Sequence, residues 1–404
     1  MEILDVKAPI QEDESLTRFE YHNVLPYSSH SFNNNDEIRI LIHQQDIITL
    51  PCESRLYVEG TLKKAGELPL NPEDGLTDNA IPHLFSEIRY ELNGIVIDRV
   101  RNPGITSLLK GLLSYTTNDA PTMSNSSFKI TNKQSENFNF CVPLSTLLGF
   151  AEDYKKVLFN VKQELILIRS RTDNNAIVDS AGNKQLTITL NAVQWQVPFV
   201  NVNDEYRLNF LNLMQKNIPI QMAFRTWQLY EYPNLNDTTS SISWPVRLSS
   251  AQEKPRFIIT GFQTHRKDQL QKSASIFDQC NIRQMRLFIG SECYPYVPLT
   301  ANFSQQQIAI LYENFLAFRK KYYHGHTENP LLPIVCRDEF LNFYPIWVID
   351  CSRQSEIIKS GSVDIRLDIE GKGNFPANTT AYCLIISDSL VEYIPFTGIV
   401  RVIV

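Results

Sequence analysis

The residues with the clearest potential for chemistry are two histidines and a glutamate in the second half of the chain. The sequence there reads His324-Gly325-His326-Thr327-Glu328. On a β-strand, side chains two positions apart point to the same side. Two imidazoles and a carboxylate are common ligands of zinc. A strand at this position would therefore present part of a metal site.

The rest of the sequence argues against that metal site. The pattern resembles half of the metal-binding motif of cupins, but such a site needs another histidine on a later strand, and none follows His326. The first half offers only single, scattered histidines: His22, His30, His43 and His83. The pattern also follows Arg319-Lys320-Lys321 at a predicted helix end, where basic residues and histidine interact favourably with the helix dipole. We predict no metal ligands and no cofactor, and keep a metalloenzyme as the third alternative.

Other catalytic patterns are missing from the sequence. There is no Gly-x-Ser-x-Gly elbow, no catalytic cysteine signature, no Gly-x-Gly-x-x-Gly and no Walker A loop. The seven cysteines are widely spaced, with no Cys-x-x-Cys pair, so neither a disulfide framework nor a zinc site is indicated. We predict that the protein has no catalytic residues and is not an enzyme.

Composition favours a large folded protein that does not grip nucleic acid. The chain has 404 residues, 43% of them hydrophobic, and a net charge of −6, which does not suit a broad nucleic-acid-binding surface. The basic stretches Arg266-Lys267 and Arg319–Lys321 are short, so we interpret them as solvated charge, with a DNA-facing inner patch as the lesser alternative. The start of the chain lacks a secretory signal pattern, and no apolar run reaches transmembrane length.

Strands are predicted nearly everywhere along the chain. Apolar and polar residues alternate in residues 363–370 and 186–192, the period of a strand with one buried face. Asn93-Gly94 favours a type I′ hairpin turn, and Gly290-Ser291 suits type II′. Short strands with tight turns favour antiparallel sandwiches.

The second half repeats the order of the first at an offset of about 200 residues. Four segments recur in the same order: residues 55–60 with 256–261, the hairpins 87–98 and 283–296, strands 161–169 and 363–370, and strands 186–198 and 381–395. We predict an ancient duplication of one β-rich unit, with the boundary near residues 201–204, where the strand ending at Pro198 gives way to a short connector.

One helix is predicted directly after each hairpin. In the first half, Asn102 offers an N-cap and Pro103 the first helical position, followed by an apolar face of Ile105, Leu108, Leu109 and Leu112. In the second half, Ser304 and Gln307 form a predicted capping box, with Phe303 stapled onto Ile308. The apolar face there continues through Leu311, Phe315, Phe318 and Tyr322.

At these residues the chain resembles a known family. Residues 31–40, 44–46, 50–51, 87–94, 97–99 and 101–102 resemble double jelly-roll proteins of the viral major capsid type, in particular those of adintoviruses and Polinton-type elements, including copies integrated in invertebrate genomes. The resemblance implies an all-β fold of two tandem eight-stranded antiparallel jelly-roll β-sandwiches, each with a short helix in a connecting loop. It divides the chain into an N-terminal arm (residues 1–18), a first jelly roll (19–201) and a second (202–404).

The resemblance also implies a function by association. Members of the family form homotrimers whose six jelly rolls make a pseudo-hexagonal capsomer of an icosahedral shell. The implied partners are the chain itself, neighbouring capsomers and a separate penton or minor capsid protein, in a virion assembled inside the host cell. Candidate interface aromatics, which could equally fill the core, are Trp227, Tyr230, Tyr232, Trp244, Tyr294, Tyr296, Tyr322, Tyr323 and Trp347. The alternative is a monomeric double β-sandwich that binds protein or carbohydrate, such as a viral fold taken over by a host.

Overall fold

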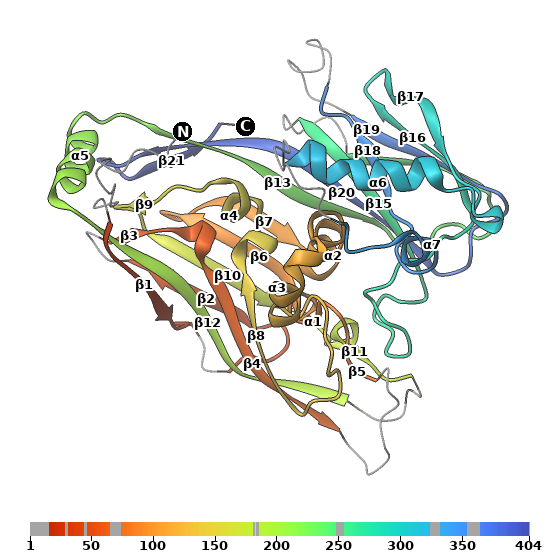
Figure 1. The fold of residues 1–404 in the computed structure, drawn as a ribbon, viewed down its shortest axis with the longest axis horizontal. Helices are drawn as coiled ribbons and strands as arrows, with labels where there is room; N and C mark the ends of the chain where they lie inside the picture. Colours follow the sequence, from red (N-terminus) through yellow and green to blue (C-terminus); the bar gives the residue numbers. More distant parts are fainter. Residues whose placement is uncertain are drawn as a thin grey trace, which may run out of the picture.

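The structure is a computed structural model, and it describes residues 16–28, 31–43, 47–64, 74–180, 182, 186–247, 254–323, 332–353 and 364–403. Within these residues the strands form two β-sandwiches that lie side by side (Figure 1). We call the sandwich built from β1–β12 roll 1 and the one built from β13–β21 roll 2. Residues 1–15 of the predicted arm and the predicted chemical group His324, His326 and Glu328 lie outside the described residues.

Roll 1 consists of two facing antiparallel sheets. The first sheet has the order β1 (Leu16–Val24), β12 (Leu186–Val202), β4 (Arg55–Lys64) and β8 (Asn137–Pro143), extended by the short strands β3 (Ile48–Thr49) and β9 (Leu158–Phe159). The second sheet has the order β2 (Glu37–Ile42), β10 (Gln163–Arg169), β6 (Phe85–Leu92) and β7 (Ile95–Arg101). These two strand orders, with the eight long strands divided between two facing sheets, are those of a jelly roll.

Roll 2 repeats this order strand for strand. Its first sheet runs β13 (Ile220–Tyr232), β20 (Thr379–Ile394), β15 (Pro255–Thr264) and β18 (Trp347–Asp350), with β21 (Ile399–Val402) added beside β20. Its second sheet runs β14 (Ser241–Arg247), β19 (Ile365–Gly371), β16 (Ile282–Ile289) and β17 (Glu292–Thr300). The predicted all-β fold of two eight-stranded antiparallel jelly rolls is confirmed.

The four predicted pairs of segments occupy equivalent places in the two rolls. β4 and β15 both lie beside the last long strand of their roll, and β10 and β19 both lie between the first strand and the hairpin of the second sheet. In β19, Ile365, Leu367 and Ile369 are buried while Arg366 is exposed, so the predicted alternation is confirmed.

Both predicted hairpin turns have the expected backbone. Asn93 and Gly94, between β6 and β7, have φ values of 50° and 81°, as a type I′ turn requires. Between β16 and β17, Gly290 has a φ of 59° and Ser291 has no positive φ, as expected for type II′.

A helix follows each hairpin. Asn102 and Pro103 occupy the predicted N-cap and first helical positions of the first helix, but neither predicted side-chain cap forms. α2 (Pro103–Ser114) follows β7, and the Asn102 amide donates to Glu231 in roll 2 (2.8 Å) instead of capping the helix. α6 (Ala309–Tyr322) begins five residues after Ser304. Gln306 has a φ of 56°, and the Gln307 N–H donates to the Asn302 carbonyl. This turn replaces the capping box and delays the helix.

The remaining elements lie in connections. They are α1 (Ala80–His83), α3 (Ala120–Asn125), α4 (Gly149–Asp153), α7 (Arg337–Asn342) and the paired short strands β5 (Gly75–Leu76) and β11 (Ile177–Val178). The link between the rolls is α5 (Asp204–Gln215), which lies at one end of the molecule (Figure 1). The prediction of a strand ending at Pro198 and a plain connector is wrong, because β12 continues to Val202 and Asn203 then caps α5 by accepting from the Tyr206 N–H.

Candidate assembly surfaces

The structure brings no metal-binding group together among the residues it describes. No cluster of three or more His, Cys, Asp or Glu side chains suited to a metal occurs in that part of the chain. All seven cysteines are free thiols. Burial raises the pKa of the Cys351 and Cys383 thiols, which keeps both protonated and unreactive.

A buried charged cluster joins the two rolls. Lys110, on the hidden side of α2, is 3% exposed. Its ammonium group donates to Glu152 of α4 (2.7 Å), to Ser114 (2.8 Å) and to the Tyr323 hydroxyl of roll 2 (3.0 Å). Burial alone lowers the pKa of Lys110, but Glu152 and Tyr323 more than offset this and leave it raised. The ammonium also lies 4.1 Å from the centre of the Tyr322 ring, close enough for a cation–π contact.

The cluster continues to the edge strand of roll 2. Arg225 of β13 donates from its backbone N–H and its guanidinium to Asp153 at the end of α4, and its guanidinium stacks 3.5 Å from the centre of the Tyr322 ring. The Arg225 pKa is raised, because Asp153 and Tyr322 outweigh the effect of burial. Gly149 allows this close approach, since a Cβ there would lie 1.7 Å from the Arg225 carbonyl oxygen. α4 thus covers the free edge of β13.

Asp98 of β7 lies beneath α4. One carboxyl oxygen accepts from the Phe150 N–H (2.8 Å), and the other has no hydrogen-bond partner among the described residues. Burial outweighs the backbone donors and raises the pKa of Asp98 to about 7. The junction therefore contains a carboxyl group that titrates near neutral pH.

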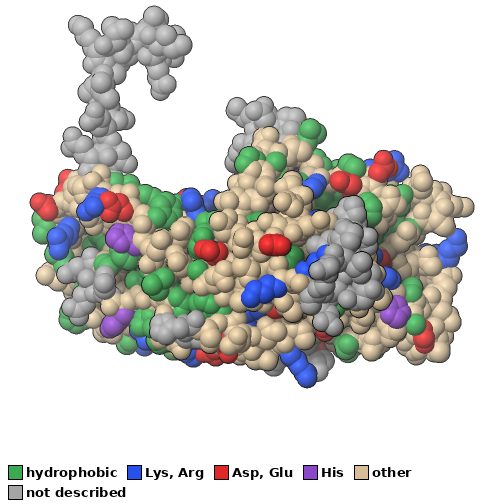
Figure 2. Space-filling view, turned by 90° about the horizontal axis from the view of Figure 1, so that it is seen from below, with side chains coloured by type: hydrophobic (Ala, Val, Ile, Leu, Met, Phe, Trp, Pro, Cys, Tyr) green, Lys and Arg blue, Asp and Glu red, His purple; other side chains and the backbone are tan. Residues whose placement is uncertain are grey.

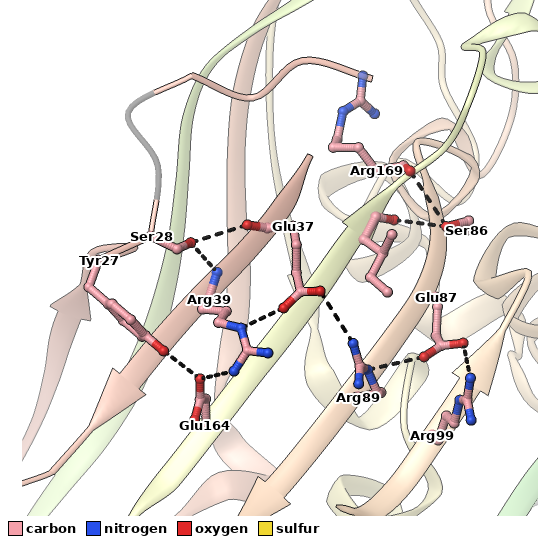
Figure 3. A network of polar contacts seen from close by, with 11 residues as sticks. Tyr27, Ser28, Glu37, Arg39, Ser86, Glu87, Arg89, Arg99, Glu164 and Arg169 are labelled. Carbon is pink, nitrogen blue, oxygen red and sulfur yellow. Dashed lines mark hydrogen bonds and ion pairs between the residues drawn. The ribbon is translucent and has the colours of Figure 1, made fainter. Parts of the chain in front are cut away.

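The outer face of the second sheet of roll 1 carries a ladder of ion pairs (Figure 3). Arg39 of β2 bonds Glu37 and reaches Glu164 of β10 at 3.1 Å. Farther along, Glu87 of β6 bridges Arg89 (3.1 Å) and Arg99 of β7 (2.6 Å). Charges of alternating sign keep this sheet face polar, so we do not expect it to bury against an apolar partner.

The predicted basic stretches are occupied by partners within the chain. Arg266 forms two 2.8 Å hydrogen bonds with Asp278, and Lys267 pairs with Glu231. Arg319 donates to the Ser114 carbonyl across the junction (2.9 Å). These contacts hold the three side chains within the molecule. The interpretation as solvated charge and the DNA-facing alternative both stay predictions.

Most of the nine predicted aromatics pack inside the molecule. Trp227, Trp244, Tyr322 and Trp347 are buried, while Tyr230, Tyr232 and Tyr294 are partly buried against the core. Tyr323 lies at the junction between the rolls. Only Tyr296, at 95% exposure, points fully outward, next to Val297 at 69%. Both lie in the irregular part of β17, residues 295–298, where the pairing with β16 shifts register.

Other exposed apolar residues were not predicted from the sequence. Phe19 and Tyr21 on β1 are 43% and 40% exposed. Tyr206, Leu208 and Leu211 on α5 are also exposed. In Figure 2, hydrophobic side chains interrupt the polar surface on the left half of the face shown. All residues of β1 are exposed or only half-buried. A strand without a buried face has no strong alternation of apolar and polar residues, so the sequence did not mark β1 as a surface strand.

The fold is similar to that of several viral proteins. The chain matches VP54 of the virus PBCV-1, fitted into a reconstruction of the virophage Sputnik, with a TM-score of 0.59, 11% identity and 98% coverage of both chains. It matches the Faustovirus major capsid protein with a TM-score of 0.55, 8% identity and coverage of 96% of this chain and 92% of that one. For the mavirus major capsid protein the TM-score is 0.53, the identity 13%, and the coverage 95% and 89%.

A search of curated protein sequences gave no match. The sequence model of the double jelly roll-like domain, however, matches residues 75–391, which span parts of both rolls. Strand order, duplication and the sequence match agree over most of the chain. The protein belongs to the double jelly roll-like domain family.

Proposed function

We propose that this protein is the major structural subunit of an icosahedral viral or virus-like capsid. Three copies form a homotrimeric pseudo-hexagonal capsomer of six jelly rolls, and capsomers tile the shell together with a separate penton or minor capsid protein. The observation that carries the proposal is the presence of two complete jelly rolls with the same strand order in one chain. The likeness in fold to viral capsid proteins along nearly the whole chain supports it.

The surfaces suit association rather than catalysis. Apolar side chains gather at β1, α5 and the irregular part of β17, and apolar and aromatic residues are enriched at the centres of protein interfaces. The proposal places the protein in the virion. It divides the chain into the arm and the two rolls near residues 18 and 201, within two residues of the start of β1 and the end of β12. No helix among the described residues is long and apolar enough to cross a bilayer.

The solution mass tests the proposal. Light scattering of the purified chain should give a mass three times that of the 46.5 kDa chain, and negative-stain microscopy should show hexagonal particles or closed shells. A capsomer subunit depends on its neighbours for stability, so its melting temperature should rise with protein concentration. A well-behaved monomer at all salt concentrations and pH values would instead favour the binding-module alternative and refute the capsid role.

A further inference from the structure

The two rolls have equivalent edge strands, β1 and β13, but among the described residues only β13 is covered. Each is the first strand of its roll and pairs on one side with the last long strand, β12 or β20. The other side of β13 is covered by α4 and β7 of roll 1. Among the described residues, β1 pairs with no strand other than β12.

The strand registers align these two edges residue by residue. In roll 1, Leu56 pairs with Trp195, which pairs with Val24. In roll 2, the equivalent Phe257 pairs with Ile386, which pairs with Trp227. Val24 therefore corresponds to Trp227. Counting back along the two strands, Tyr21 corresponds to Phe224 and Phe19 to Met222.

Apolar residues at these equivalent positions differ sharply in burial. Met222 and Phe224 are 0% and 4% exposed, and Phe224 packs edge-on against Phe150 of α4 with ring centres 5.2 Å apart. Phe19 and Tyr21 are 43% and 40% exposed. Roll 1 helps to bury the edge of roll 2, while the described part of the chain provides no equivalent cover for the apolar side chains at the same edge of roll 1.

The side of roll 1 that packs against β13 also has a counterpart in roll 2. β7, which packs against β13, is the second strand of its hairpin, and β17 is the equivalent strand of roll 2. Its irregular part carries Tyr296 and Val297, among the most exposed apolar side chains that the structure describes. β1 and β17 lie at opposite ends of the molecule, so they cannot meet within one chain (Figure 1).

We infer that β17 of one copy packs against the β1 edge of a second copy, repeating between chains the contact that β7 and β13 make within the chain. The inference rests on the proposed capsid function and names the two faces that join its subunits. Such a contact is head-to-tail, and contacts of this kind close into a ring when the rotation between copies permits. Phe19 and Tyr21 then meet Tyr296 and Val297 of the neighbouring copy.

Chemical cross-linking tests this pairing directly. The variant Phe19→Cys/Val297→Cys is made in a Cys293→Ser/Cys336→Ser background and treated with a short bismaleimide. We expect covalent dimers and trimers from the assembled fraction. Each single cysteine variant should stay at background, because a head-to-tail contact does not bring two copies of the same face together. The matched control is Phe19→Cys/Phe396→Cys, since Phe396 has the same exposure as Val297, 69%, but lies at the turn between β20 and β21.

A substitution provides the second measurement. Tyr296→Glu should raise the concentration needed for half-assembly about tenfold or more, with an unchanged circular dichroism spectrum, whereas Phe396→Glu should leave assembly unchanged. A trimer that persists in Tyr296→Glu and gives no cross-link overturns the inference but leaves the proposed function standing. A wild-type chain that never assembles overturns both.

Discussion

Lys110 shows how a charge can be hidden in an otherwise apolar helix. The apolar face of α2 was predicted correctly, since Ile105, Leu108, Leu109 and Leu112 are buried. Lys110 lies off that face. Its ammonium group is buried between Glu152 of α4 in roll 1 and a second cover from roll 2, where the Tyr323 hydroxyl accepts from it. The apolar periodicity of α2 cannot show that roll 2 packs on another side of the helix. The sequence therefore did not reveal the junction between the rolls.

Removing this ammonium group should weaken the junction strongly. Lys110→Met leaves the Glu152 carboxylate buried without its cation, and breaking such a pair costs about 3–5 kcal/mol. The double variant Lys110→Met/Glu152→Gln should lose less than the sum of the single losses, as measured by urea denaturation. In the control, Lys321→Met removes the partly exposed pair with Asp350 (2.8 Å) and should cost at most about 1 kcal/mol. Equal losses in Lys110→Met and Lys321→Met would contradict this role.

Asp98 should make stability depend on pH. Its pKa is about 7 in the folded chain and about 3.9 when unfolded, so the folded state binds the extra proton in this interval. The unfolding free energy should therefore fall as the pH rises from about 4 to about 7, by on the order of 4 kcal/mol. Asp98→Asn removes this titration, and denaturation at several pH values should show a flatter profile. The same slope in both proteins would show that Asp98 is not the responsible group.

At the level of elements, α4 is the feature that fixes one roll against the other. It is short, five residues, and begins at Gly149, whose backbone lies against the Arg225 carbonyl of β13. The sequence did not mark it, because five residues are too few for a helical period to be recognised. Strands and hairpins were easier to predict, since alternation and turn residues such as Asn93-Gly94 are local signals.

A single methyl group at this point should disturb the junction. Gly149→Ala places a Cβ 1.7 Å from the Arg225 carbonyl oxygen, so β13 and α4 must separate. We expect a loss of about 1–3 kcal/mol in the free energy of unfolding. Gly373→Ala is the matched control, because a Cβ at Gly373 meets no atom within 4 Å. Thermal denaturation of both variants would decide the matter: equal melting temperatures would rule out a tight contact at Gly149.

At the level of the whole molecule, the duplication was the part of the fold that the sequence revealed best. The recurrence of four segments in one order predicted two equivalent units, and the sheets have equivalent strand orders. The capsid resemblance agrees with the family match, while the specific kinship with adintoviruses and Polinton-type elements stays a prediction. The assembly surfaces could not be predicted, because whether Phe19 or Phe224 is covered depends on how the rolls are placed, not on either strand alone.

The helix α5 has a consequence for the order of events in assembly. Because it ties β12 to β13, each roll 2 meets its own roll 1 at an effective concentration on the order of millimolar, whatever the amount of protein in the cell. The contact inside the chain therefore forms at any dilution, whereas the proposed contact between chains would have to wait until enough chains have accumulated. In the proposed trimer, covalent linkage would turn a six-body encounter into a three-body one, and closure of the ring would be the step that protein concentration controls.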